Sequence, residues 1–86
     1  MDAFKGKWKD QNNDIISIEE SNNMAILKYS NGRGPFSGYG LDLGSPVISV
    51  NFSDDSNPKE SLQAGLMDFS KNTITWSNTT VWRKNK

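Results

Sequence analysis

The segment "SNGRGPFSGYG" (residues 30–40) holds the densest group of residues that could contact a ligand or a partner protein. Its four glycines surround Arg33, Phe36 and Tyr39. Glycine allows positive φ angles and close backbone approach, and Asn31-Gly32 is typical of a hairpin turn. One interpretation is therefore a tight turn followed by a glycine-kinked strand. The other is a loop that presents Arg33 and two aromatic rings to a ligand, or inserts them into a partner's cleft.

Residues for catalysis are scarce. The chain contains no Cys and no His, which removes thiolate nucleophiles and the usual Ser-His and Cys-His pairs. Asp54, Asp55 and Asn57 could supply oxygen ligands for calcium, but the regular acidic loop with its distal Glu is missing. We therefore expect a protein that is not an enzyme and has no metal site and no cofactor.

The charge balance narrows the class of partner. Lys plus Arg and Asp plus Glu are 10 each, so the net charge is zero. No basic groove is predicted, so nucleic acid is not expected as a partner. No apolar run reaches the roughly 20 residues that a membrane helix needs, and no signal-peptide pattern precedes residue 10. We expect a cytoplasmic location and no membrane partner.

Polar turn-forming clusters recur about every ten residues along the chain and separate short apolar segments. Several of these segments alternate with period two, as in Ile48/Val50/Phe52, which is typical of half-buried strands. The segment 57–69 could instead start a helix at Pro58, but Gly65 and the alternation beside it favour a strand. The pattern predicts eight strands, at about 6–10, 14–20, 24–30, 36–42, 47–52, 61–68, 73–77 and 80–84.

Short connections predict antiparallel pairing between neighbours in sequence. An eight-stranded meander gains by closing, because closure removes both exposed edges. The predicted fold is therefore all-β, a single domain over residues 1–86 that forms a small eight-stranded antiparallel meander barrel. A partly open barrel and a two-sheet sandwich are the alternatives.

The two ends of the chain resemble the calycin pattern, which lipocalins, avidins and small bacterial metalloprotease inhibitors share. The first strand carries G-x-W within "FKGKWK", and the last carries Arg83 within "TVWRK". The resemblance implies that the last strand pairs with the first and that Arg83 lies across Trp8 near the barrel floor. It also implies that "MDAF" (1–4) forms a short turn, with Phe4 plugging the base.

The remaining aromatic residues divide between core and surface. Trp76 alternates with Ile74, which favours the core. Trp82 has the opposite parity to Arg83, so we expect it to be exposed. Tyr29, Tyr39 and Trp82, with nearby Asn and Asp, could stack on a sugar ring.

These observations predict a non-catalytic binding module. The first hypothesis is a lipocalin-like barrel that binds a small apolar or amphipathic ligand through residues Tyr29, Arg33, Phe36, Tyr39 and Trp82. The alternative is a protein-interaction module, an inhibitor or subunit partner, that uses the 31–39 loop or an apolar outer face. Pairs such as Val47/Ile48 and Leu66/Met67 are apolar on both faces of their strands, so a homodimer is also considered. A carbohydrate-binding domain is third.

Overall fold

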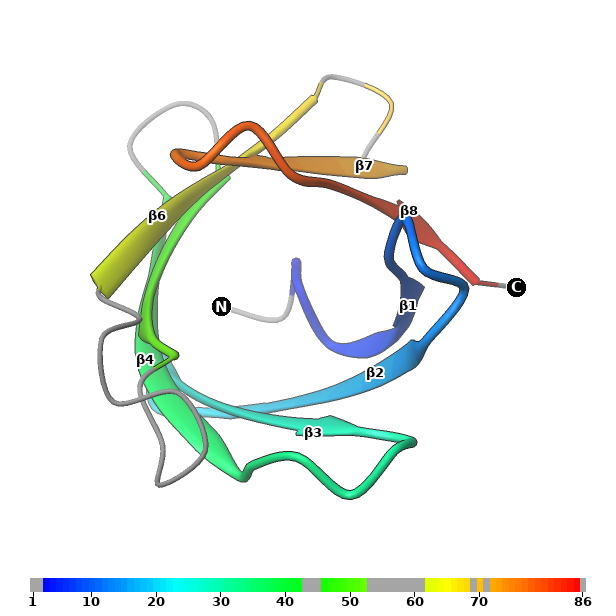
Figure 1. Cartoon of the computed structure of the whole chain (residues 1–86). Coiled ribbons are helices and arrows are strands. Elements are labelled where there is room, and N and C mark those ends of the chain that lie inside the picture. Colours follow the sequence, from blue (N-terminus) through cyan, green and yellow to red (C-terminus); the bar gives the residue numbers. More distant parts are fainter. Residues whose placement is uncertain (1–2, 43–45, 53–61, 69, 71, 86) are drawn as a thin grey trace.

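The computed structural model describes residues 3–42, 46–52, 62–68, 70 and 72–85. Eight strands follow one another in meander order and close into a barrel, in which every strand is antiparallel to its neighbours (Figure 1). The strands are β1 (Gly6–Lys9), β2 (Ile15–Ser21), β3 (Met24–Tyr29), β4 (Phe36–Asp42), β5 (Pro46–Asn51), β6 (Leu62–Met67), β7 (Thr73–Trp76) and β8 (Val81–Lys84). The predicted fold is confirmed, and each strand boundary lies within one residue of its predicted place.

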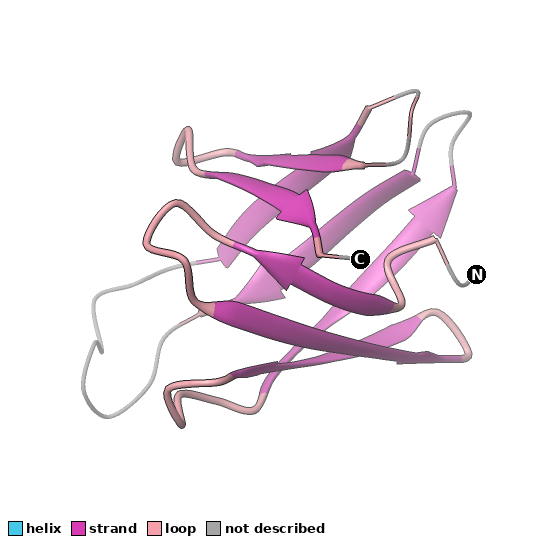
Figure 2. Cartoon of the chain, turned by 90° about the vertical axis from the view of Figure 1, so that its right-hand side faces the viewer, coloured by secondary structure: helices cyan, strands magenta, loops and turns pink. Residues whose placement is uncertain are grey.

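Barrel closure joins the two ends of the chain. In β1 and β8, Trp8 lies opposite Lys84 and Lys9 lies opposite Arg83. Figure 2 shows the barrel from the side. Because side chains alternate between the two faces of a strand, this register sends Trp8 and Lys84 to one face of the barrel wall and Lys9 and Arg83 to the other.

The core fills the inside of the barrel with alternate residues from the strands. An eight-stranded barrel is only wide enough for its own side chains. The buried apolar residues are Phe4, Trp8, Ile16, Ile18, Ala25, Leu27, Phe36, Ile48, Val50, Phe52, Met67, Ile74, Trp76 and Trp82. Phe4 and Trp8 of this set come from the start of the sequence and Trp76 and Trp82 from its end, so the core depends on closure of the barrel.

Gly65 in β6 makes room for the aromatic residues beside it. It lies opposite Trp76 of β7, and it is buried. A Cβ atom at this position would lie 2.8 Å from Ile74 Cγ2 and 3.1 Å from Trp76 Cε3. The missing side chain therefore allows the indole of Trp76 to pack close to the backbone of β6. The region proposed above as a possible helix is a strand at residues 62–67, and residues 57–61 lie outside the described part.

Candidate functional site

The hairpin loops β1–β2, β3–β4 and β7–β8 lie at the same end of the barrel, because every second turn of a meander returns to the same end. In each loop a side-chain oxygen accepts a hydrogen bond from a backbone N–H two residues further on. The donors are Asn12 N to Asp10 Oδ1 at 2.9 Å, Arg33 N to Asn31 Oδ1 at 3.0 Å, and Thr80 N to Asn78 Oδ1 at 3.0 Å. These Asx turns fix the three loops, which together form the rim of the open end of the barrel.

Two of these loops are joined although they are far apart in sequence. The backbone N–H of Val81 donates to Gln11 Oε1 at 3.2 Å. The first loop is further closed by backbone hydrogen bonds between Asp10 and Asp14 and between Asn13 and Asp10. Asn13 adopts a φ of 67°, a conformation that asparagine tolerates better than most residues. The rim next to the β1–β8 seam is therefore an ordered structure.

A cluster of aromatic rings lies beneath this rim. The ring centroids of Trp76 and Trp82 are 4.8 Å apart, and those of Phe52 and Trp76 are 5.1 Å apart. Tyr29 meets both Trp82 and Phe36 edge-on, with centroids 6.0 Å apart in each case. Edge-to-face contacts of this kind are worth roughly 0.5–1.5 kcal/mol each beyond the area that they bury. The cluster forms a rigid aromatic floor.

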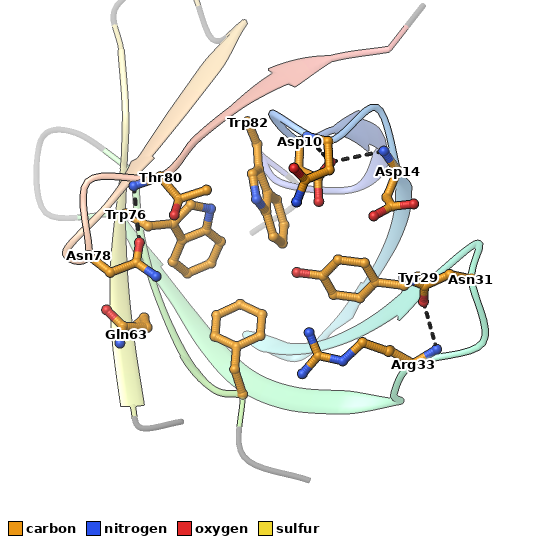
Figure 3. A pocket seen from close by; sticks show the side chains of 12 residues that line it. Asp10, Asp14, Tyr29, Asn31, Arg33, Gln63, Trp76, Asn78, Thr80 and Trp82 are labelled. Carbon is orange, nitrogen blue, oxygen red and sulfur yellow. Dashed lines mark hydrogen bonds between the residues drawn. The ribbon is translucent and has the colours of Figure 1, made fainter. Parts of the chain in front are cut away.

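The floor and the rim enclose a pocket with a volume of about 350 Å³ that is open to solvent on one side. Figure 3 shows the rings of Tyr29, Trp76 and Trp82 extending toward its centre, with the polar side chains around them. The lining residues are either polar or aromatic, and none of those described is aliphatic: Asp10, Asn12, Asp14, Tyr29, Asn31, Arg33, Phe52, Gln63, Trp76, Asn78, Thr80 and Trp82.

Arg33 folds back over the aromatic floor. Its guanidinium carbon lies 5.5 Å from the ring centroid of Tyr29 and 5.2 Å from that of Phe36, within the range of a cation–π interaction. Tyr29 and Arg33 are also paired through their backbones, since Tyr29 N donates to the Arg33 carbonyl at 3.1 Å. The β3–β4 loop therefore does not present Arg33 as a protruding finger.

The indole N–H of Trp76 is an exception to the hydrogen bonding of the site. Trp76 is 3% exposed, and within the described residues its Nε1 has no hydrogen-bond partner. Buried donors are nearly always paired, so an unpaired one in a native structure calls for an explanation. A ligand oxygen that reaches the floor of the pocket would supply the missing acceptor.

The opposite end of the barrel is closed by the segment before β1, which lies inside the ring of strands in Figure 1. Phe4 and Trp8 are fully buried there. The Phe4 N–H donates to Glu20 Oε1 at 2.6 Å, and Trp8 Nε1 donates to the Phe4 carbonyl at 2.9 Å. The structure thus places Phe4 and Trp8 in a structural plug, and residues 1–2 of the predicted turn lie outside the described part.

The residue over Trp8 is Lys84, which corrects the expectation for Arg83. Lys84 Nζ lies 4.8 Å from the ring centroid of Trp8 and donates to the Lys5 carbonyl at 2.9 Å. Gly6 provides the space, because a Cβ atom there would come within 2.9 Å of Lys84 Nζ. Arg83 is exposed, because it has the outward parity of Lys9, the residue opposite it.

The same parity corrects the expectation for Trp82. It is buried, with 2% of its surface exposed, because it shares the inward face of β8 with Lys84. Of the residues predicted to bind a ligand or partner, the structure brings together Tyr29, Arg33, Phe36 and Trp82. Phe36 lies within the aromatic cluster below Arg33 and does not line the pocket. Tyr39 is 60% exposed on the outer face of β4, away from the other four.

The sequence-based prediction missed Phe52 and Trp76 of the floor and the polar residues of the rim. One signal could have identified the rim, because alternate loops of a meander share an end. The Asx-forming residues Asp10, Asn31 and Asn78 occur in loops of this one set. Phe52 and Trp76 carry the inward parity of their strands, and parity alone cannot separate the core from the floor of a pocket.

Within residues 3–42, 46–52, 62–68, 70 and 72–85, no group of three or more acidic side chains is placed to hold a metal ion. Asp54, Asp55 and Asn57, considered above for calcium, lie outside these residues. Over the same part of the chain, no helix is long and apolar enough to cross a membrane.

The outer face of the barrel carries an apolar patch on β3–β6. Tyr39 lies opposite Met24 on β3, while Leu41 and Leu66 both lie opposite Val47 on β5. The large apolar side chains exposed on the described outer surface are Met24, Ile26, Tyr39, Leu41, Leu62 and Leu66. We call these six residues the outer patch.

Charges are distributed unevenly around the barrel. Every outward residue of β4–β7 whose side chain the structure describes is uncharged, and these are Ser37, Tyr39, Leu41, Val47, Ser49, Asn51, Leu62, Ala64, Leu66, Thr73 and Thr75. Charged residues such as Lys7, Glu19 and Arg83 are exposed on β1, β2 and β8.

In comparisons with known proteins, the chain matches no family model, no curated protein and no solved structure.

Proposed function

We propose that the protein is a non-catalytic binding module that holds a small amphipathic ligand at the open end of its barrel. The observation that carries this proposal is the pocket of about 350 Å³, with an aromatic floor and a polar rim. Its volume falls in the range of small-molecule sites, which combine apolar walls with a few placed polar groups. An amphipathic ligand would place its apolar face on the rings of the floor and its polar groups along the rim.

The division of the barrel into two ends supports the same proposal. At the closed end, Phe4 and Trp8 are fully buried, and at the other end each loop is held by its own Asx turn. A plug at one end and a ligand at the other is the arrangement that the calycin resemblance implies. The proposed site lies at the mouth, because the core fills the barrel below it.

The test is a titration of ¹⁵N-labelled protein with a library of small amphipathic molecules, followed by heteronuclear NMR. We expect binding to shift signals of residues 10–14, 31–33 and 76–82, with little change at Phe4 and Trp8. Tyr29→Phe removes a hydroxyl that points into the pocket (Figure 3) and is expected to weaken binding. Tyr39→Phe, on the outer face, is the matched control. Shifts that map elsewhere, or no binding by any compound, would contradict the proposal.

A second candidate function rests on the outer patch and on the uncharged outward residues that the structure describes on β4–β7. We propose that this face binds a second copy of the chain. Two copies of the β4–β7 face meet without charge repulsion, and a charged residue borders the outer patch at its β3 edge, where Glu19 lies opposite Ile26. Six large side chains that are about half exposed amount to on the order of 600 Å² per copy, close to the roughly 800 Å² per partner of a standard interface.

Sedimentation velocity at rising protein concentration tests this second candidate. The wild type is expected to approach the mass of a dimer, and Leu66→Lys is expected to remain monomeric. Ser17→Lys, on the outer side of β2, introduces the same charge away from the outer patch and is expected to leave the dimer intact. A monomer at every concentration, or a dimer that survives Leu66→Lys together with Tyr39→Lys, would exclude this interface.

A further inference from the structure

The hydrogen-bonding groups of the pocket are partly assigned by the rim itself. Asn31 and Asn78 each use their side-chain oxygen to accept a backbone N–H of their own turn. This use identifies the oxygen of each amide and leaves the NH₂ group as the donor that a ligand can meet. Arg33 and the indole N–H of Trp76 are donors as well, so this part of the lining offers hydrogen-bond donors to a ligand.

The β1–β2 loop, in contrast, presents hydrogen-bond acceptors to a ligand. Asp10 and Asp14 line the same pocket, and an ionised carboxylate only accepts hydrogen bonds. Asp10 Oδ1 already accepts the backbone N–H groups of Asn12 and Asp14 at 2.9 Å each, while its second oxygen and the Asp14 carboxylate complete the acceptor side. In Figure 3 these two residues lie across the pocket from Asn78. A ligand must therefore both donate and accept hydrogen bonds.

The charges of the lining disfavour an ionic ligand. An organic anion attracted to Arg33 would also meet the carboxylates of Asp10 and Asp14 within the same 350 Å³. An organic cation attracted to those carboxylates would meet the guanidinium of Arg33. A neutral ligand avoids both repulsions, and a hydroxyl group is a neutral group that donates and accepts through a single oxygen atom.

The aromatic floor adds a requirement for an apolar ring-sized surface. Trp76, Trp82 and Tyr29 extend into the pocket (Figure 3), and Phe52 lies between the two tryptophans and Phe36. One face of a pyranose ring carries C–H groups, while its edge carries hydroxyls. The N–H of Trp76 is buried and unpaired within the described residues, so a ligand oxygen that reached it would supply its acceptor.

We infer that the pocket binds a neutral carbohydrate of one or two sugar rings, an inference that rests on the proposed function of the pocket. Some hydroxyls of the sugar would donate to Asp10 and Asp14, and others would accept from Asn31 and Asn78. The C–H face would lie on the aromatic floor, and a hydroxyl oxygen would accept from Trp76 Nε1. The polar rim and the shallow floor suit such a ligand better than a fatty acyl chain.

The test uses ¹⁵N-labelled protein and three kinds of probe. Methyl β-D-glucopyranoside, methyl α-D-mannopyranoside, methyl β-D-galactopyranoside and maltose are the sugars, followed by an array of neutral glycans. Decanoate is the anionic amphipath, and benzylammonium is the cationic one. We expect at least one sugar to shift the Trp76 indole N–H signal downfield and to move the signals of the three rim loops.

Two isosteric variants make the test specific. Asp14→Asn removes an acceptor that lines the pocket and is expected to weaken sugar binding about tenfold, as the loss of a hydrogen bond to a charged group does. Glu19→Gln, exposed on the outer side of β2, is its control. Thr80→Val removes a rim hydroxyl and keeps the shape of the side chain, and Thr75→Val on the outer side of β7 is the control for it.

The outcomes separate this inference from the function on which it rests. If decanoate or benzylammonium occupies the pocket and no sugar does, the inference of a carbohydrate ligand is wrong, and the proposed ligand-binding function is still supported. The inference also fails if a sugar binds in the pocket with an affinity that Asp14→Asn and Thr80→Val leave unchanged. If no probe of any kind shifts the signals of the pocket residues, both the proposed function and the inference of a carbohydrate ligand are wrong.

Discussion

Lys84 and Trp8 lie opposite each other across the seam that closes the barrel, and the ammonium group of Lys84 lies 4.8 Å from the centre of the Trp8 ring. The same ammonium donates to the Lys5 carbonyl, so one side chain joins the last strand to the segment that enters the first. The contact combines a cation–π interaction with a charge-assisted hydrogen bond. It is expected to stabilise the closed barrel.

Replacing Lys84 by Met keeps an unbranched apolar stem and removes both interactions. We expect the free energy of unfolding to fall by about 1–2 kcal/mol, measured by urea denaturation. Arg83→Met is the matched control, and it should change the stability by less than about 0.5 kcal/mol because Arg83 is exposed. Equal effects of the two substitutions would argue against Lys84 as the closing residue.

At the neighbouring pair of Lys9 and Arg83, we expect a substitution that raises the free energy of unfolding. Both residues are exposed and lie directly opposite each other on β1 and β8, and like charges in that position are destabilising. Arg83→Glu is therefore expected to stabilise the protein by about 0.2–1 kcal/mol at low salt. The gain should shrink in high salt and vanish in the Lys9→Gln background, as a double-mutant cycle in urea would show.

Gly65 is expected to be intolerant of any side chain. In Gly65→Ala, the new methyl group would collide with Ile74 and with the ring of Trp76. Overpacking of this kind typically costs about 1–3 kcal/mol. We also expect changed tryptophan fluorescence, because Trp76 must move. Ala64→Ser, at the exposed position next to it, should change neither. If Gly65→Ala left the free energy of unfolding unchanged, the wall behind Trp76 would be able to accommodate a methyl group.

Asp68 predicts how stability depends on pH in the β6–β7 connection. The Ser70 hydroxyl donates to its carboxylate at 2.8 Å, and the N–H groups of Asn72 and Thr73 donate at 3.1 and 3.2 Å. These bonds, that from Ser70 above all, hold the pKa of Asp68 below its ordinary value of 3.8. Because the folded pKa is lowered, the stabilisation is complete above about pH 3.8 and is lost as the pH falls through the folded pKa.

The measurement is a series of denaturant titrations between neutral and acidic pH. Asp68→Asn is expected to be less stable than the wild type at neutral pH, and the difference should narrow as Asp68 of the wild type becomes protonated. Asp14→Asn is the control, since its carboxylate accepts no hydrogen bond among those that fix the β6–β7 connection. A difference that stays constant over the whole range would contradict the assignment.

The sequence predicts the strands of this fold well because local signals define both strands and turns. Turn residues such as Asn31-Gly32 mark the ends, and alternation marks the interior of each strand. Parity in the last strand was harder to predict. Four residues of β8 alternate without a clear polar face, and the prediction placed Arg83 inward by resemblance. The register with β1 determines which residues point inward, and that register is a long-range property.

The candidate site likewise depends on strand pairing, which residue types alone do not reveal. Tyr29, Arg33 and Trp82 were predicted from residue type and lie together, whereas Tyr39 satisfies the same criteria and lies on the outer face. Residue type indicates which side chains can bind, and only the pairing of strands shows which of them share one end of the barrel. Trp76 has the inward parity of a core residue, and its place above the filled part of the core makes it a lining residue.

Barrel closure also has a consequence for the order of events during synthesis. The hydrogen bond between Val81 and Gln11 spans 70 residues, and the pairing of β1 with β8 spans nearly the whole chain. A nascent chain that lacks β8 has two unpaired strand edges, on β1 and β7, and no Trp82 above its core. Exposed edges of this kind favour aggregation. The pocket therefore first exists after β8 has left the ribosome, so a chain that stalls shortly before it lacks the pocket and is prone to aggregate.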